Sequence, residues 1–284
     1  MKILRKIRIF ILENIVEKII YQPSIFSYLV HMTLNYKAFG QGDPLIILHG
    51  LFGTLDNWQT IGKKLADQYS VYLIDQRNHG RSPHHADFSY ALMAEDLKLF
   101  MEEQWIYRAH IIGHSMGGKT AMQFAMEYPD MIDQLVVVDI APKAYAGGHQ
   151  LIFEALNSLD LANIDNRKTA DEALAQKIDD FGVRQFLLKN LTREKAGGYR
   201  WKMNLPVIQQ HYQDILAPIT LTEPFEEKAL FIRGGKSAYV EDDDWPMVQS
   251  YFPNSSLATV EQSGHWVHAE APQDLLQLVF DFLG

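Results

Sequence analysis

Residues 110–117 read His-Ile-Ile-Gly-His-Ser-Met-Gly, a short apolar run that leads into a Gly-x-Ser-x-Gly element. In a nucleophile elbow of this kind the serine occupies a sharp turn between a strand and a helix, and a Cβ on either flanking glycine would crowd the turn. Ser115 would then project its hydroxyl above a sheet, with the positive end of the following helix beneath it. Because the motif also arises by chance, its interpretation depends on the rest of the chain.

The same residues also fit a second motif. Gly113–Thr120, GHSMGGKT, satisfies the phosphate-binding pattern Gly-x-x-x-x-Gly-Lys-[Ser/Thr], and residues 135–139, LVVVD, resemble the strand and aspartate that position magnesium in nucleotide hydrolases. In a P-loop Lys119 would pair with phosphate oxygens, whereas after an elbow it is merely a residue in the first turns of a helix. The two motifs cannot both be functional, so other strand ends must separate them.

One such strand end can supply an oxyanion hole. The segment His49–Gly53, HGLFG, follows an apolar run at 45–48. A backbone amide of Leu51 or Phe52 could join that of Met116 there and stabilise the alkoxide of a tetrahedral intermediate. This arrangement favours acyl transfer over phosphate binding.

Two more strand ends also favour the elbow. Asp75–Ser82, DQRNHGRS, follow the run at 71–74, and a nucleotide hydrolase has no need of such a segment. His265 follows the last apolar run, 257–260, and lies 150 residues after Ser115. The order serine, acid, histidine is that of a hydrolase triad. The polar residues around these loops are expected to hold the loops in place without reacting: His49, Asp75, Arg77 and His79.

Short β-rich runs alternate with helical stretches along most of the chain. Strands are expected at 33–39, 45–48, 71–74, 110–112, 135–138, 229–232 and 257–260. Between Ala141 and Pro224 the alternation stops, and helical patterns without a convincing strand occupy 151–159, 171–181, 184–191 and 205–216. The chain is therefore predicted to be an α/β protein. Its central sheet is mostly parallel and covered by helices on both faces, and a helical lid at about 141–224 lies over one end.

Five motifs in this order resemble the α/β-hydrolase fold, and more narrowly its subgroup of small bacterial esterases with mitochondrial relatives. They are HGLFG, DQRNHGRS, GHSMGGK, VVVDIAP and GHWVHAE, and the match runs from about Met32 to Gly284. The resemblance disfavours the P-loop interpretation. It implies that Ser115 is the nucleophile and that His265 is the general base, which later protonates the leaving group.

The acid of the triad departs from the commonest pattern of the fold. Most members place it after the strand that corresponds to 229–232, where this chain has Ser237 at the aspartate position. A hydroxyl cannot supply the negative charge that stabilises an imidazolium, so we expect Asp139, after the run at 135–138, to be the acid. Ser237 would be an auxiliary hydrogen-bond partner of the histidine or the acid. The alternative acids lie just downstream of Ser237: Glu241, Asp242, Asp243 and Asp244.

Composition excludes several classes of protein. The formal net charge is −9, with 26 Lys and Arg against 35 Asp and Glu, so binding to nucleic acid is not expected. With no cysteine there is no thiolate nucleophile, no disulfide and no Cys-ligated metal. His84, His85 and His268 lack the spacing of a metal site, so no metal is expected. Hydrolysis through an acyl-enzyme needs no cofactor, so none is expected either.

The sequence therefore predicts a serine carboxylic-ester hydrolase that forms an acyl-enzyme on small or medium acyl esters. A thioester such as an acyl-CoA would suit the same groups, and Arg184, Lys189 or Arg200 could meet its phosphates. Trp266 and Trp201 are candidates for lining the acyl pocket. Two alternatives stay open: a C–C bond hydrolase of the same fold, and a non-catalytic protein that binds a small ligand.

The N-terminal residues differ in charge from the rest of the chain. Residues 1–20 carry a balance of +3, whereas the remainder carries −12, and their apolar residues recur at helical spacing. Residues 1–31 are thus predicted to form an amphipathic extension before a hydrolase domain at 32–284. Translation could instead begin at Met32, or residues 1–20 could dock on the domain or contact an anionic membrane surface. The expected location is cytoplasmic.

Overall fold

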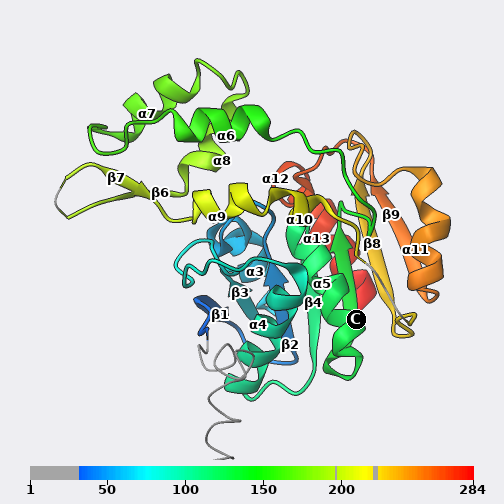
Figure 1. Cartoon of the computed structure of the whole chain (residues 1–284). Helices are drawn as coiled ribbons and strands as arrows, with labels where there is room; N and C mark the ends of the chain where they lie inside the picture. The colour runs from blue at the N-terminus through cyan, green and yellow to red at the C-terminus, as the bar shows by residue number, and fades with distance from the viewer. Residues whose placement is uncertain (1–31, 196, 220–222) are drawn as a thin grey trace, which may run out of the picture. The chain divides into compact units, whose positions relative to one another are not determined.

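A seven-stranded sheet forms the centre of the described chain (Figure 1). The computed structural model describes residues 32–195, 197–219 and 223–284. The strand order is β1-β3-β2-β4-β5-β8-β9, in which β1 pairs antiparallel with β3 and every other pair is parallel. The strands are β1 Tyr36–Phe39, β2 Pro44–Leu48, β3 Ser70–Ile74, β4 Ala109–His114, β5 Ile132–Val138, β8 Ala229–Gly234 and β9 Ser255–Val260.

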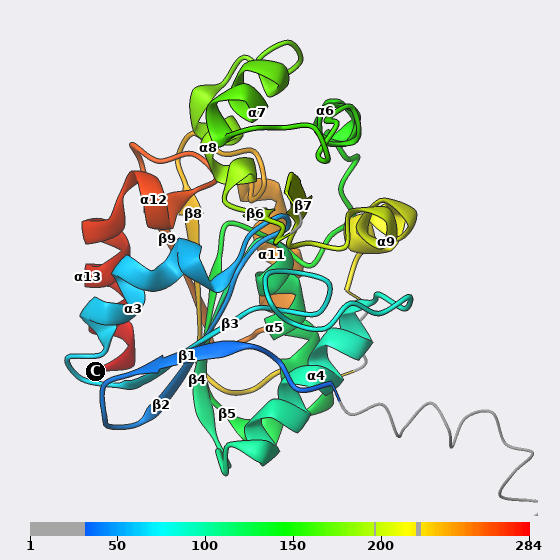
Figure 2. The ribbon, with the colours of Figure 1, turned by 90° about the vertical axis from the view of Figure 1, so that its left-hand side faces the viewer.

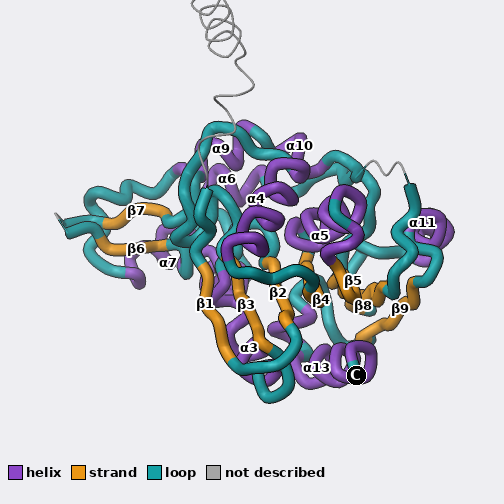
Figure 3. The backbone as a smooth tube through the Cα atoms, turned by 90° about the horizontal axis from the view of Figure 1, so that it is seen from below, coloured by secondary structure: helices purple, strands orange, loops and turns teal. Residues whose placement is uncertain are grey.

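Helices cover both faces of this sheet. Helices α3 (Gln59–Leu65) and α13 (Pro272–Leu283) lie on one face, and α4 (Tyr90–Glu103) and α5 (Met116–Glu127) lie on the other (Figures 2 and 3). Two further helices, α11 and α12, and three 3₁₀ turns belong to the same part of the molecule. Their bounds are α11 Trp245–Tyr251, α12 Val267–Glu270, η1 Leu55–Trp58, η2 Pro129–Met131 and η3 Asp242–Asp244.

The central strands contain continuous apolar stretches because both faces of the sheet are covered. Leu45–Leu48 of β2 and Leu135–Val138 of β5 are fully buried. Strand β4 lies between them, and its last residues, Gly113 and His114, pair with Val137 and Val138 of β5. The predicted parallel sheet is confirmed, and its register brings the ends of β4 and β5 next to each other.

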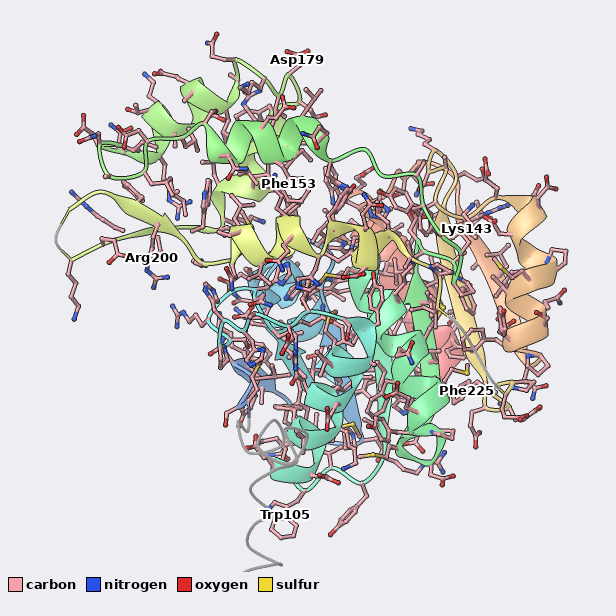
Figure 4. All side chains as sticks on the ribbon, viewed as in Figure 1. Trp105, Lys143, Phe153, Asp179, Arg200 and Phe225 are labelled. Atoms are coloured by element: carbon pink, nitrogen blue, oxygen red, sulfur yellow. The ribbon has the colours of Figure 1, made fainter. Side chains whose placement is uncertain are left out.

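The segment between β5 and β8 lies beyond the edge at which β4 and β5 end (Figure 1). It contains helices α6 Gln150–Asn157, α7 Arg167–Leu174, α8 Phe181–Leu188, α9 Leu205–Gln210 and α10 Tyr212–Leu216, and strands β6 Leu191–Arg193 and β7 Tyr199–Trp201. Phe153 of α6 lies between this helix and α9, whereas Trp105 lies at the opposite end of the sheet (Figure 4). An apolar cluster joins Phe153, Leu187 and Ile208 to Phe52 of the loop after β2 and to Met116 at the start of α5.

Two expectations for this segment are wrong. A helical pattern was expected without strands, but Leu191 pairs with Trp201 and Arg193 with Tyr199 in a short antiparallel hairpin. Three-residue strands are too short for an alternating pattern to stand out in the sequence.

The helix expected at 171–181 is instead divided. Helix α7 ends at Leu174. Asn166 caps its start by accepting from the amides of Lys168 and Thr169, so the helix begins at Arg167. Asp180 caps the start of α8 by accepting from the amide of Val183, so the next helix begins at Phe181. The caps decide the boundaries, because both side chains satisfy amides that have no partner within the helix.

Among the described helices, none is both long enough and apolar enough to cross a bilayer. The predicted amphipathic extension at 1–31 lies outside the described residues.

Candidate active site

Ser115 occupies the turn between β4 and α5 with the strained backbone of an elbow. Its φ and ψ are 54° and −120°, outside the regions that side chains usually adopt. A Cβ on Gly113 would lie 2.3 Å from the carbonyl oxygen of Gly117, and one on Gly117 would lie 2.4 Å from that of Leu48. The prediction that this turn requires both glycines is confirmed.

His265 and Asp139 continue a chain of hydrogen bonds from the serine. The Ser115 hydroxyl lies 3.0 Å from His265 Nε2, and His265 Nδ1 lies 2.7 Å from Asp139 Oδ2. An ionised carboxylate only accepts hydrogen bonds, so Nδ1 carries the imidazole proton and Nε2 is free to accept from the serine. The three residues come from the ends of β4 and β5 and from the loop after β9.

Asp139 is completely buried and its carboxylate is held by several donors. It follows β5 with a positive φ of 51°, and its Oδ1 accepts from the amide of Gly234 at 2.9 Å. The Ser237 hydroxyl donates to Oδ2, the oxygen that also faces His265. These bonds satisfy a carboxylate that would otherwise be costly to bury.

The alternative acids are engaged elsewhere. Asp242 pairs with Arg233 at 2.7 Å, and Asp244 pairs with Lys143 at 2.6 Å. Glu241 lies 3.9 Å from the same lysine. Asp243 belongs to the 3₁₀ turn η3 and has a mostly exposed side chain. Asp139 is therefore the carboxylate that the structure brings to His265.

Two contacts of His265 were not anticipated from the sequence. The ring of Tyr239 stacks on the imidazole, with centroids 3.9 Å apart and planes inclined by 18°. On another side, His114 Nε2 lies 2.8 Å from the His265 carbonyl oxygen and donates to it. Burial keeps the pKa of His114 well below its usual range, so this ring is neutral. No motif identifies Tyr239, because its position depends on the course of the loop after β8.

The candidate oxyanion amides are distinguished by their hydrogen bonds. Met116 is the first residue of α5, where an amide has no partner within the helix. The amide of Phe52 donates to His79 Nε2 at 3.3 Å, whereas that of Leu51 has no partner in the part of the chain that the structure describes. Burial lowers the pKa of His79 to about 3, so its ring is neutral and can accept. Of the two candidates in this loop, the structure favours Leu51.

The polar residues expected to hold the surrounding loops do so. His49 Nε2 accepts from the amide of Gln76 at 3.1 Å. The Asp75 carboxylate accepts from the amides of Leu55 and Arg81. Arg77 forms a buried ion pair with Asp96, with Nε 2.5 Å from Oδ2. The bonds of His49 with Gln76 and of Asp75 with Leu55 join the loops after β2 and β3, and the ion pair joins the latter loop to α4.

A cavity of about 610 Å³ opens over Ser115. Its lining is mainly apolar or aromatic, and includes Phe52, Ile152, Phe186, Leu187, Ile215 and Trp266. Trp266 lies in this lining, and its ring lies 5.6 Å from that of Phe186. The prediction for Trp201 is wrong, because pairing with Leu191 in the hairpin directs this residue to the apolar cluster and away from the cavity lining.

Lys119 belongs to the contact between α5 and the segment above it. Its Nζ donates to the carbonyl oxygens of Leu216 at 3.3 Å and Ala217 at 2.5 Å, and lies 4.9 Å from the centre of the Tyr145 ring. A lysine held in this way is not available to phosphate oxygens. The structure gives no support to the P-loop interpretation.

Of the histidines weighed as metal ligands, His84 and His85 adjoin in sequence, and His268 belongs to another part of the fold. His84 contacts the carbonyl oxygen of Lys202, and His268 stacks on Trp58 with centroids 4.5 Å apart. Within residues 32–195, 197–219 and 223–284, no three histidine, aspartate or glutamate side chains are grouped so that they could hold a metal ion.

The fold and the site together define a serine hydrolase built on a parallel sheet. The chain belongs to the α/β-hydrolase fold family, which matches residues 43–272. The zebrafish (Danio rerio) protein named sn-1-specific diacylglycerol lipase ABHD11 is 38% identical over 263 residues, covering 89% of this chain and 83% of the zebrafish protein.

Bacterial and structural relatives have similar names. The Escherichia coli (strain K12) protein named Esterase YbfF is 36% identical over 241 residues, 84% of this chain and 92% of the relative. A solved structure described as a marine microorganism esterase matches with a TM-score of 0.87 and 44% identity, covering 88% of this chain and 99% of that one. Family and relatives support a serine ester hydrolase of the carboxylesterase type.

Proposed function

We propose that this protein hydrolyses carboxylic esters through an acyl-enzyme on Ser115, with His265 as general base and Asp139 as the acid of the triad. The observation that carries the proposal is the unbroken chain of hydrogen bonds, 3.0 Å from serine to histidine and 2.7 Å from histidine to aspartate. Such a chain activates a hydroxyl that is a poor nucleophile on its own.

The proposed reaction has two halves. Ser115 Oγ attacks the ester carbonyl while His265 Nε2 takes its proton, and the amides of Met116 and Leu51 stabilise the alkoxide. As the C–O bond to the alcohol breaks, His265 returns the proton to the leaving oxygen. Water then attacks the acyl-enzyme with His265 again as base, and the acid and the free serine are released.

The groups around Asp139 are proposed to support this proton transfer. The buried carboxylate stabilises the imidazolium that forms when His265 accepts a proton. Ser237 donates to the carboxylate oxygen that faces the histidine, so it would orient the acid without carrying charge. Tyr239 limits the imidazole to one plane through stacking.

The cavity and the relatives together suggest the substrate. A mainly apolar space of about 610 Å³ fits small or medium acyl chains, and partial acylglycerols are a substrate class suggested by the relatives named diacylglycerol lipase. Thioesters would suit the same triad. However, Arg184 pairs with Asp171 and Arg200 with Glu194, which leaves only Lys189 of the three cations proposed for phosphate without an ion pair among the described residues.

The segment at about 141–224 is proposed to act as the lid of this cavity, since Ile152, Phe186 and Ile215 contribute to the lining.

Contact of residues 1–20 with an anionic membrane surface stays a prediction. Binding to anionic vesicles tests it: the vesicles should retain the full chain but not a chain that begins at Met32. A cytoplasmic location stays a prediction, which cell fractionation would test.

Labelling with a fluorophosphonate tests the nucleophile directly. We expect an adduct on the peptide that contains Ser115, with a matching loss of hydrolysis of p-nitrophenyl acetate, butyrate and longer esters. The Ser115→Ala variant should give neither adduct nor turnover. An unlabelled, inactive wild-type protein would contradict the proposal and favour a ligand-binding role. Labelling without ester turnover would direct attention to C–C bond substrates.

A further inference from the structure

His149 is a polar residue in the lining of a mainly apolar cavity, and the proposed mechanism does not use it. It immediately precedes helix α6, and its ring is fixed by aromatic neighbours. The imidazole meets the ring of Phe52 at 5.8 Å and that of Tyr212 at 5.6 Å, both in edge-to-face geometry. Because Phe52 adjoins Leu51, the imidazole lies beside the loop of the candidate oxyanion hole.

The hydrogen bonds of Tyr212 determine which imidazole nitrogen carries the proton. The Tyr212 oxygen accepts from the backbone amide of His149 at 3.2 Å. Among the described residues, the acceptor within hydrogen-bond distance of the phenol's own hydrogen is His149 Nδ1, at 2.6 Å. A neutral imidazole that accepts at Nδ1 must carry its hydrogen on Nε2.

Burial keeps this ring neutral at physiological pH. Loss of hydration lowers the pKa of His149 to about 4, and a proton on nearby His265 would lower it in the same direction. Its Nε2–H is thus a neutral donor, and it has no hydrogen-bond partner in the described part of the chain. The nitrogen is not enclosed by protein atoms, so a ligand in the cavity can reach it. A donor of this kind in an apolar cavity discriminates strongly between ligands with and without an acceptor.

We infer that His149 binds a second oxygen atom of the substrate, an ether, hydroxyl or carbonyl oxygen outside the ester that is cleaved. The cavity would then select oxygen-bearing esters over alkyl esters of equal size. This inference rests on the proposed esterase function and assigns a specificity role to the His149–Tyr212 pair. His149 is not needed for proton transfer, so esters without a second oxygen should still be hydrolysed.

Matched pairs of esters test the inference and show where the oxygen is recognised. Butyl butanoate against 2-methoxyethyl butanoate places the ether oxygen in the alcohol half. Ethyl pentanoate against ethyl 3-methoxypropanoate places it in the acyl half. The measured quantity is kcat/KM for the ether ester divided by kcat/KM for the alkyl ester of the same pair. An ether oxygen also changes the intrinsic reactivity of an ester, so this ratio is compared between wild type and variant.

In His149→Phe we expect this ratio to fall about threefold to tenfold for at least one pair, the effect of losing one neutral hydrogen bond. His149→Gln, which keeps an N–H donor, should retain the ratio within about twofold. Tyr212→Phe should lower it in the same direction as His149→Phe, because the imidazole loses the donor that fixes its tautomer. Ile152→Val, an apolar change in the same lining, should affect both esters of a pair equally.

Ratios that stay unchanged for both pairs in His149→Phe and Tyr212→Phe would overturn the inference. Fluorophosphonate labelling of Ser115 shows that each variant retains a formed site, and Tyr212→Phe serves alone if His149→Phe does not fold. A wild-type protein that neither labels nor hydrolyses any ester contradicts the proposed function instead, so the two failures are distinguishable.

Discussion

Asp139 and Ser237 meet at one carboxylate oxygen, yet only Asp139 carries charge. Asp139→Asn should lower kcat about 10³-fold or more, because an amide cannot stabilise the imidazolium and favours the wrong tautomer. Ser237→Ala removes one neutral donor from the carboxylate but leaves its charge, and should cost about tenfold to a hundredfold. Rates on p-nitrophenyl butyrate, with circular dichroism to confirm folding, measure both. An active Asp139→Asn together with inactive variants in the loop at 242–244 would contradict the assignment of the acid.

At this scale the sequence predicts residues fixed by a motif better than those placed by a loop. Ser115 and His265 are predicted from Gly-x-Ser-x-Gly and from their order along the chain. Asp139 is predicted because the usual position of the acid holds Ser237, which cannot carry the charge. The choice between Leu51 and Phe52 depends on a single bond from the Phe52 amide to His79, which no pattern encodes. Tyr239 was missed for a similar reason, since its ring reaches His265 through the turn of a loop.

At the scale of elements, Lys119 joins helix α5 to the end of α10. Burial lowers the pKa of Lys119 to about 7, whereas a lysine in the unfolded chain titrates near 10.5. Between these values the unfolded chain binds more protons, so the free energy of unfolding should rise with pH. We expect the Tm of the wild type to rise from pH 7 to pH 9 relative to that of Lys119→Met.

Lys119→Met should also lower the Tm at pH 7, because two carbonyl oxygens at the end of α10 lose their donor. Lys168→Met, at an exposed position on α7, is the control and should change neither the Tm nor its pH dependence. A Tm for the wild type that falls relative to Lys119→Met as the pH rises would show that the lysine is not desolvated.

Elements of the sheet were easier to predict than those of the segment above it. Leu45–Leu48 of β2 and Leu135–Val138 of β5 are buried, so each strand contains a continuous apolar run that marks it clearly. Between β5 and β8 the boundaries depend on the caps Asn166 and Asp180. The hairpin of β6 and β7 depends on pairing across a turn, a contact that composition does not reveal.

At the scale of the whole molecule, buried histidines should make folding sensitive to acid. His268 stacks on Trp58, and its Nδ1 has no hydrogen-bond partner within the described residues. Burial lowers the pKa of His268 to about 3, so below pH 6.5 the unfolded chain takes up a proton that the folded protein refuses. One such histidine removes up to about 2 kcal/mol of stability between pH 6.5 and 5.

His268→Phe keeps the stacked ring and removes the titrating group. The drop in Tm from pH 7 to pH 5 should therefore be smaller in His268→Phe than in the wild type. His85→Gln, at a partly exposed surface position, should leave that drop unchanged. Equal drops in all three proteins would mean that His268 is hydrated and titrates normally.

The position of the proposed acid at the end of β5 has a consequence for how this enzyme can diverge. The proposed nucleophile and acid follow neighbouring strands of the sheet, and the loop after β8 contributes a neutral hydroxyl and a stacked ring. Insertions or substitutions in that loop can therefore change the rate by degrees without removing the charge on which catalysis depends. This gives evolution, or a protein engineer, a part of the catalytic centre that can be varied gradually.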